Sequence, residues 1–115
     1  MDSNDALVQS LFQEIRRGSV VIAALSLLRR SQYGYALLER LNGVGIEVEA
    51  NTLYPLLRRL ETQGLLESTW TTDEARPRKY YRTSDAGAKA LDALTVEWRR
   101  VTDALLTLVE HGERI

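Results

Sequence analysis

The sequence predicts an α+β chain that is mainly helical and carries one small β-hairpin. Apolar residues recur at helical spacing in several separate stretches, and the last of these is long enough for a helix of about 26 residues. Two short segments rich in aromatic and β-branched residues flank a polar loop just before that last stretch. A chain of 115 residues with 44% hydrophobic content has the mass for one domain with one modest core.

The composition excludes several classes of function. The chain has no cysteine, so it has no disulfide, no thiolate metal site and no cysteine nucleophile. Its one histidine, His111, precedes Gly112, and we expect it to help end a helix. No glycine-rich phosphate loop follows a strand. We therefore predict that the protein is not an enzyme and needs no metal and no cofactor.

Hydropathy and the charge of the first residues indicate the cellular compartment of the protein. The longest apolar run, residues 20–28, is interrupted by Ser26 and is far too short to span a bilayer. The chain opens with two aspartates within its first five residues, which is the wrong charge for a signal peptide. We expect a cytoplasmic protein with no membrane partner.

The first half of the chain predicts three helices. Residues 5–16 place apolar side chains on one face, and Gly18 is expected to break that helix. Residues 19–30 are apolar nearly all round, which is typical of a buried helix. A third helix over residues 35–42 is ended by a glycine-rich turn, and residues 46–48 alternate as an extended segment does.

The next helix carries the strongest functional signal. It starts near Glu49 or Ala50, ends at Gly64, and has leucines at i, i+3, i+4 and i+7 as its buried stripe. Another side of the helix carries groups that bond base edges and phosphates in a major groove. These residues are Asn51, Thr52, Tyr54, Pro55 and Arg58. Because Pro55 lies inside the helix, we expect a slight irregularity there.

A β-hairpin follows this helix. Residues 65–71 and 78–83 are the two predicted strands, and the polar loop 72–77 joins them. Although the net charge is −1, residues 76–82 hold four cations and no acid, while residues 85–115 hold six acids against four cations. Two helices with a short connection, then a hairpin with a basic loop, describe a winged helix-turn-helix. The cations expected at phosphates or in the minor groove are Arg76, Arg78 and Lys79.

The helix alone leaves a second interpretation open. A helix with two arginines is also compatible with an ordinary solvated surface, and a charge run is most often a solvated face. The alternative function is a winged-helix adaptor that binds a protein partner and no DNA. The net charge and the acids at Asp73 and Glu74 favour the adaptor, whereas the arginines and lysine grouped on one side favour DNA.

The last segment predicts a dimer. Ser84 is a plausible N-cap for a helix that runs from residue 85 to about residue 110. Its apolar residues are spaced 3, 4, 3, 4 and 3, which is a heptad seam that a domain this small cannot bury. The seam consists of Leu91, Leu94, Trp98, Val101, Leu105 and Leu108. A second copy of the chain is the natural partner, and its two-fold symmetry suits a palindromic DNA site. We divide the chain into a DNA-binding part, 1–84, and a dimerisation helix, 85–115.

Trp98 admits two interpretations within that seam. An indole at such a position can be plain interface packing. Alternatively, two copies near the dimer axis offer flat faces to a planar aromatic or cationic ligand, which the charged neighbours Glu97, Arg99 and Arg100 would orient.

Several motifs occur together in the order and spacing of a known family. They are Gly34-Tyr35, Thr52-Leu53-Tyr54-Pro55, Arg59-Leu60-Glu61, Gly64-Leu65-Leu66, Arg78-Lys79-Tyr80-Tyr81 and Gly87. Over roughly residues 18–90 the chain resembles the PadR-type bacterial transcriptional regulators. The resemblance implies a homodimeric winged-helix protein that binds double-stranded DNA, usually a repressor, often released by a small ligand. It also adds Tyr35 to the DNA-binding residues, and the single C-terminal helix resembles the shorter branch of the family.

Three positions depart from the family pattern. Asn51 stands where a glycine is frequent, and Glu49 stands where a serine or threonine is usual. Asp73 and Glu74 occupy a wing that is glycine- or proline-rich in many relatives. The acidic wing puts the wing's share of DNA binding in question and leaves the helix assignment unchanged.

Overall fold

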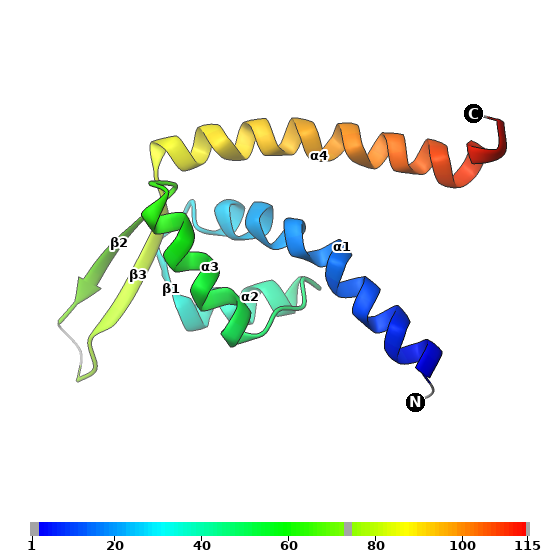
Figure 1. The fold of residues 1–115 in the computed structure, drawn as a ribbon. Helices are drawn as coiled ribbons and strands as arrows, with labels where there is room; N and C mark the ends of the chain where they lie inside the picture. The colour runs from blue at the N-terminus through cyan, green and yellow to red at the C-terminus, as the bar shows by residue number, and fades with distance from the viewer. Residues whose placement is uncertain (1–2, 73–74, 115) are drawn as a thin grey trace.

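A computed structural model of the chain describes residues 3–72 and 75–114 (Figure 1). The predicted acidic wing residues, Asp73 and Glu74, lie outside the described residues. The elements follow the chain as α1 (Ser3–Leu27), β1 (Gln32–Tyr33), α2 (Gly34–Gly43), α3 (Ala50–Thr62), β2 (Leu66–Thr71), β3 (Arg78–Thr83), α4 (Asp85–His111) and the short 3-10 turn η1 (Gly112–Arg114). This arrangement is the predicted winged helix-turn-helix with a long C-terminal helix.

The first two predicted helices form one continuous helix, α1, so the expected break at Gly18 is wrong. Glycine in a helix interior costs only about 1 kcal/mol relative to alanine. The apolar stretch after Gly18 is anchored in the core through Val20, Ala24 and Leu25, and that packing outweighs the glycine penalty. The helix also ends at Leu27, earlier than residue 30, where the Gln32 side-chain amide donates to the Leu27 carbonyl at 2.7 Å.

Helices α2 and α3 end in the same way. Gly64 follows α3 with a φ of +80°, and the Leu65 N–H donates back to the Leu60 carbonyl at 2.9 Å. Gly45 follows α2 with a φ of +93° and the same backward hydrogen-bond pattern. This Schellman arrangement favours glycine because a side chain is strained at positive φ. The chain therefore turns sharply at the points that the glycines predict.

The connection between α2 and α3 differs from its prediction. Residues 46–49, all of them described, form an irregular loop and no strand. The Asn42 side chain explains why, because its amide donates to the Val48 carbonyl at 3.0 Å and its oxygen accepts from the Val48 N–H at 3.3 Å. A side chain thus takes the place of a strand partner.

The hairpin belongs to a three-stranded antiparallel sheet in the order β1-β3-β2. Strand β1, which the sequence pattern missed, pairs Gln32 with Tyr81 and Tyr33 with Tyr80. Two residues are too few to show strand periodicity. The pairing of β2 with β3 runs from Leu66 opposite Thr83 to Thr71 opposite Arg78.

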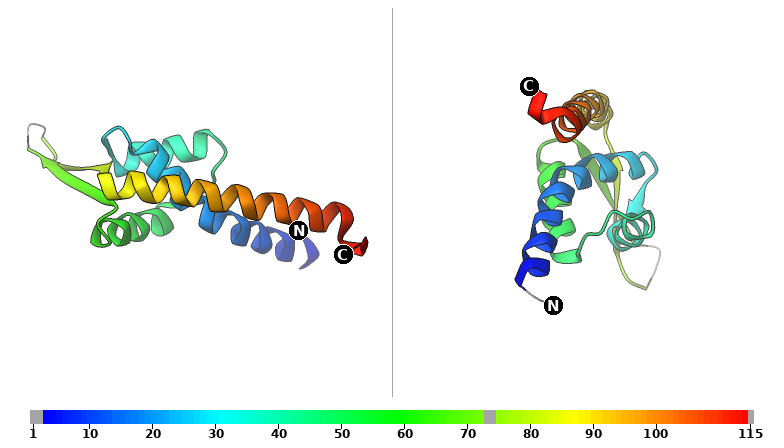
Figure 2. Two further views of the ribbon diagram at one scale, coloured as in Figure 1. Left: turned by 90° about the horizontal axis from the view of Figure 1, so that it is seen from above. Right: turned by 90° about the vertical axis from the view of Figure 1, so that its right-hand side faces the viewer.

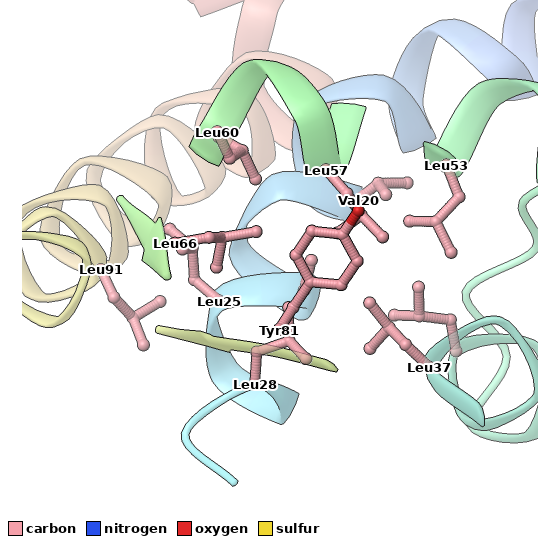
Figure 3. Packing of buried hydrophobic residues seen from close by; sticks show 12 residues of the cluster. Val20, Leu25, Leu28, Leu37, Leu53, Leu57, Leu60, Leu66, Tyr81 and Leu91 are labelled. Carbon is pink, nitrogen blue, oxygen red and sulfur yellow. The ribbon is translucent and has the colours of Figure 1, made fainter. Parts of the chain in front are cut away.

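The core lies between α1, α2, α3 and the base of the sheet (Figure 3). Its fully buried large side chains come from three helices and from Leu28, the residue just after α1. They are Leu25, Leu28, Leu37, Leu41, Leu53, Leu57 and Leu60. Tyr81 is the buried member contributed by β3. Because α3 is fixed along its leucine stripe, its opposite face is held outward at a defined angle.

Helix α4 leaves the domain from a tightly packed junction. The Ser84 hydroxyl accepts from the Gly87 N–H at 3.0 Å and donates to the Gly64 carbonyl at 2.6 Å. Gly87 itself sits against the backbone at the end of α3, where a Cβ atom would lie 2.1 Å from the Leu65 carbonyl oxygen. The start of α4 is therefore bonded directly to the end of α3.

Beyond this junction α4 runs past the domain (Figure 2), and the molecule measures 60 × 38 × 22 Å. Of the residues of α4, Gly87 and Leu91 are the buried ones. Among the helices within the described ranges, none is both long and apolar enough to cross a membrane.

Candidate nucleic-acid interface

The outward face of α3 is polar and cationic. Leu53, Leu57 and Leu60 are buried on the inner side. The exposed residues of the outer side are Asn51, Thr52, Pro55, Arg58 and Arg59. Neither arginine forms an ion pair with any residue in the described part of the chain. The helix is assigned as continuous through Pro55, so the expected irregularity does not interrupt it. The amide, hydroxyl and guanidinium groups at this face are available to a partner.

Tyr54 has a structural role that the sequence pattern did not reveal. Its side chain is half-buried, and its ring packs over Gly34 so closely that a Cβ atom there would lie 2.5 Å from Cε1. The ring therefore docks α3 on the first turn of α2. The contact of Tyr54 with a base edge stays a prediction.

Tyr35 lies in that same first turn of α2 and is 55% exposed. A side-chain hydrogen bond with the Glu39 carboxylate, together with its negative charge, raises the pKa of Tyr35. The Tyr35 phenol is thus an exposed hydroxyl that is hydrogen-bonded within its own helix, α2.

The cations of the wing are not equivalent. Arg76 is exposed and forms no ion pair with any described residue. The Arg78 guanidinium lies over the Tyr33 ring, 4.5 Å from its centroid, and Tyr33 meets Tyr80 edge-on at 5.8 Å. Cation–π stacking of this kind fixes a guanidinium plane. Arg76 is therefore the less constrained of the two guanidinium groups.

Lys79 is engaged within the protein. Its ammonium Nζ is 2.9 Å from Oε1 of Glu61, at the end of α3, and the Ser68 hydroxyl donates to the other oxygen of the same carboxylate. The bonds from Lys79 and Ser68 lower the pKa of Glu61. Sequence reasoning missed the contact of Glu61 with the wing. The available signal was an acid four residues after Leu57, on the edge of an otherwise apolar stripe.

Comparison with known proteins identifies the family. The model of the "Transcriptional regulator PadR-like family" matches residues 24–93, which is more than half of the chain. The chain belongs to the PadR-like family of transcriptional regulators. Transcriptional regulator Rv3488 of Mycobacterium tuberculosis is 38% identical over 81 residues, which cover 70% of this chain and 72% of that protein.

Solved structures agree with this assignment. A PadR family transcriptional regulator from Eggerthella lenta is 48% identical and superposes with a TM-score of 0.91, covering 95% of this chain and 97% of that one. A PadR-like transcriptional regulator from Bacillus cereus is 28% identical with a TM-score of 0.73, covering 84% of this chain and 96% of that one. The fold and the regulatory class of this PadR-family protein are thus established.

The heptad seam of this PadR-family protein divides into two parts. Leu91 is buried and Leu94 packs against the core of the same chain. The remaining four residues are exposed, with Trp98 at 49%, Val101 at 39%, Leu105 at 55% and Leu108 at 52%. The first half of α1 has a second exposed apolar face, made of Leu7, Val8, Leu11, Phe12 and Ile15. A single chain therefore leaves two large apolar helix faces uncovered.

Glu97 and Arg100, which flank Trp98 in the sequence, form an ion pair on α4. The Arg100 guanidinium donates to Glu97, with one contact at 3.1 Å, and Arg100 lowers the pKa of Glu97. Within residues 3–72 and 75–114, no three His, Cys, Asp or Glu side chains are grouped so as to hold a metal ion.

Proposed function

We propose that this regulator is a homodimeric repressor that reads a palindromic operator with α3 and touches the DNA backbone with its wing. The observation that carries the proposal is the outer face of α3, where Asn51, Thr52 and Arg58 are exposed together. The Arg58 guanidinium forms no ion pair with a described residue. Amide and guanidinium groups form the most specific bonds to base edges, and a major groove about 12 Å wide admits a helix.

The contacts divide by type. Asn51, Thr52 and Tyr54 lie in the N-terminal half of α3, the part of a recognition helix that contacts bases. Arg58 is one turn further along and reaches a guanine edge or a phosphate. Arg76 is the exposed wing cation and binds phosphate or the minor groove, where charge matters and sequence does not.

The dimer forms through α4, with α1 contributing. Trp98, Val101, Leu105 and Leu108 are exposed in the single chain although they continue a buried stripe. Exposed apolar side chains in a continuous row are typical of a protein interface. A two-fold axis between two α4 helices would present two copies of α3 to the two halves of a palindrome.

Release by a small ligand is assigned to Trp98. Two half-exposed indoles brought together at the dimer axis offer flat faces to a planar aromatic or cationic compound. We expect such compounds to quench Trp98 fluorescence, with Trp98→Ala losing the response and Trp70→Ala keeping it. Equal loss in both variants, or no quenching across a varied panel, would assign Trp98 to packing alone.

The DNA-binding proposal is tested by selecting bound duplexes from a random pool and sequencing them. A symmetric site one to two helical turns across is expected. An enriched asymmetric site would argue against the dimeric mode. Absence of binding at low salt would favour the protein–protein adaptor.

Variants then separate the two kinds of contact. Asn51→Ala should weaken operator binding by about 1–3 kcal/mol and change binding to random DNA little. Arg76→Ala should weaken both equally and reduce the slope of log affinity against log salt by about one. Arg114→Ala is the matched control and should change neither, because Arg114 lies in the C-terminal turn η1 and the C-terminus is at the far end of the molecule from α3 (Figure 1).

A further inference from the structure

Three side chains from three different elements meet at the base of the wing. They are Glu61 in the last turn of α3, Ser68 on β2 and Lys79 on β3. One carboxylate oxygen of Glu61 accepts from Lys79 at 2.9 Å, and the other accepts from the Ser68 hydroxyl. The recognition helix is thereby bonded to both strands of the hairpin through one residue.

The setting of this cluster makes the bonds effective. The side chains of Lys79 and Glu61 are 26% and 30% exposed, so water screens them less than it screens a surface pair. The ammonium also lies 5.1 Å from the centroid of the Tyr81 ring, whose side chain is part of the core. The hydrogen bond to Glu61 raises the pKa of Lys79.

The opposite face of β3 is held independently. Successive residues of a strand point to opposite faces, so Arg78 and Tyr80 project away from Lys79. Tyr33 of β1 receives both, through a 4.5 Å cation–π contact with Arg78 and an edge-on ring contact with Tyr80. The hairpin is therefore fixed against β1 on one face and against α3 on the other. Because β1 pairs only with Tyr80 and Tyr81 among the described residues, the hairpin beyond them is a two-stranded ribbon, which twists and bends more easily without the α3 contact.

We propose that Glu61 is a positioning residue for DNA recognition, which sets the angle between the wing and α3 through Lys79 and Ser68. Lys79 then acts on DNA indirectly and binds no phosphate. The Lys79 ammonium is held between Glu61 and the Tyr81 ring. A phosphate that drew it away from Glu61 would leave an unpaired carboxylate beside the DNA backbone. This proposal rests on the proposed DNA-binding function for its effect on affinity, but not for its effect on the wing itself.

The effect on the wing is measured without DNA. Trp70 is 62% exposed on β2 and stands directly opposite Lys79, so its fluorescence anisotropy reports wing motion. The chain has two tryptophans, and Trp98→Phe leaves Trp70 as the only tryptophan, which is excited selectively at the red edge of the absorption band, where tyrosine does not absorb. Glu61→Gln should lower the anisotropy of Trp70. Glu67→Gln is the matched control, because Glu67 pairs with Arg82 inside the hairpin at 3.1 Å and does not reach α3. Equal anisotropy in the parent and Glu61→Gln would overturn the proposal.

Operator binding is measured with native Trp98 in place. Glu61→Gln and Lys79→Met should each weaken binding about two- to fivefold, and the double variant should be no weaker than either. The salt slope should stay unchanged in all three. The exchanged pair, Glu61→Lys with Lys79→Glu, should recover most of the loss, and thermal melts identify any variant that merely unfolds.

A different pattern would overturn the assignment. If Lys79→Met lowers the salt slope by about one while Glu61→Gln binds as well as the parent or better, Lys79 is a direct phosphate ligand. If the parent binds no duplex at all, the DNA-binding proposal fails, and the Trp70 anisotropy alone decides the role of Glu61.

Discussion

Replacing Gly87 with alanine should strongly destabilise the protein. The new Cβ atom would lie 2.1 Å from the Leu65 carbonyl oxygen and 2.8 Å from Cγ2 of Thr83. The carbonyl would have to retreat about 0.9 Å to reach 3.0 Å, the shortest separation that real Cβ atoms show. That oxygen also accepts the Ser84 N–H at 3.1 Å, so the retreat strains a hydrogen bond. Overpacking of about 1–3 kcal/mol and a weakened hydrogen bond of about 1 kcal/mol together predict a loss of about 2–4 kcal/mol.

Urea unfolding followed by circular dichroism, at one fixed protein concentration, measures this loss. Gly43→Ala is the matched control, because it changes the same residue type at the end of a helix with nothing within 4 Å of the new Cβ. Alanine there should stabilise by about 0.4–1 kcal/mol through the unfolded state. The two variants should thus shift the urea concentration at the midpoint of unfolding in opposite directions. A neutral or stabilising Gly87→Ala would refute the close packing of α4 on the end of α3.

Three further outcomes are expected. Leu57→Ala removes a fully buried side chain and should lower the free energy of unfolding by about 2–5 kcal/mol in the same urea assay. Leu105→Asp should yield monomers by ultracentrifugation, whereas Val96→Asp, exposed and outside the seam, should stay dimeric; a dimeric Leu105→Asp would contradict the seam. Lys79 and Ser68 lower the pKa of Glu61. The ionised carboxylate therefore stabilises the folded protein fully above the ordinary pKa of 4.5, and this stabilisation is lost as the pH falls through the lowered pKa. Trp70 anisotropy should fall in that acidic range in the parent and stay flat in Glu61→Gln.

Most of the fold could be predicted because these helices, turns and strands are determined by residues close together in the sequence. The leucine stripe fixed the inner face of α3, and Gly64 marked its end through a backbone angle that glycine adopts readily. The strands 66–71 and 78–83 lie within a residue of their prediction, since the alternation and the turn are local as well. The Ser84 N-cap is confirmed by its hydrogen bond to the Gly87 N–H.

Features decided by distant contacts were missed. Gly18 was expected to break a helix, but the anchoring of the following residues in the core decided the outcome. The short strand β1 exists through its pairing with Tyr80 and Tyr81, about 50 residues away, and no local pattern indicates it. The engagement of Lys79 with Glu61 depends on how α3 docks against the hairpin. The sequence alone therefore could not show whether a cation in this basic segment is free to bind DNA or is paired within the protein.

The junction between α3 and α4 links the two halves of the proposed mechanism. The Ser84 hydroxyl donates to the Gly64 carbonyl at 2.6 Å, so the end of α3 and the start of α4 meet in one hydrogen-bonded turn. The Thr83 N–H also donates to the Leu28 carbonyl at 2.7 Å, which ties this turn to the core. With so short and rigid a connection, any rotation of α4 in the proposed dimer moves α3 with it. A ligand that changes the packing at Trp98 would then alter the separation of the two recognition helices, and a fixed palindrome tolerates little change in that separation.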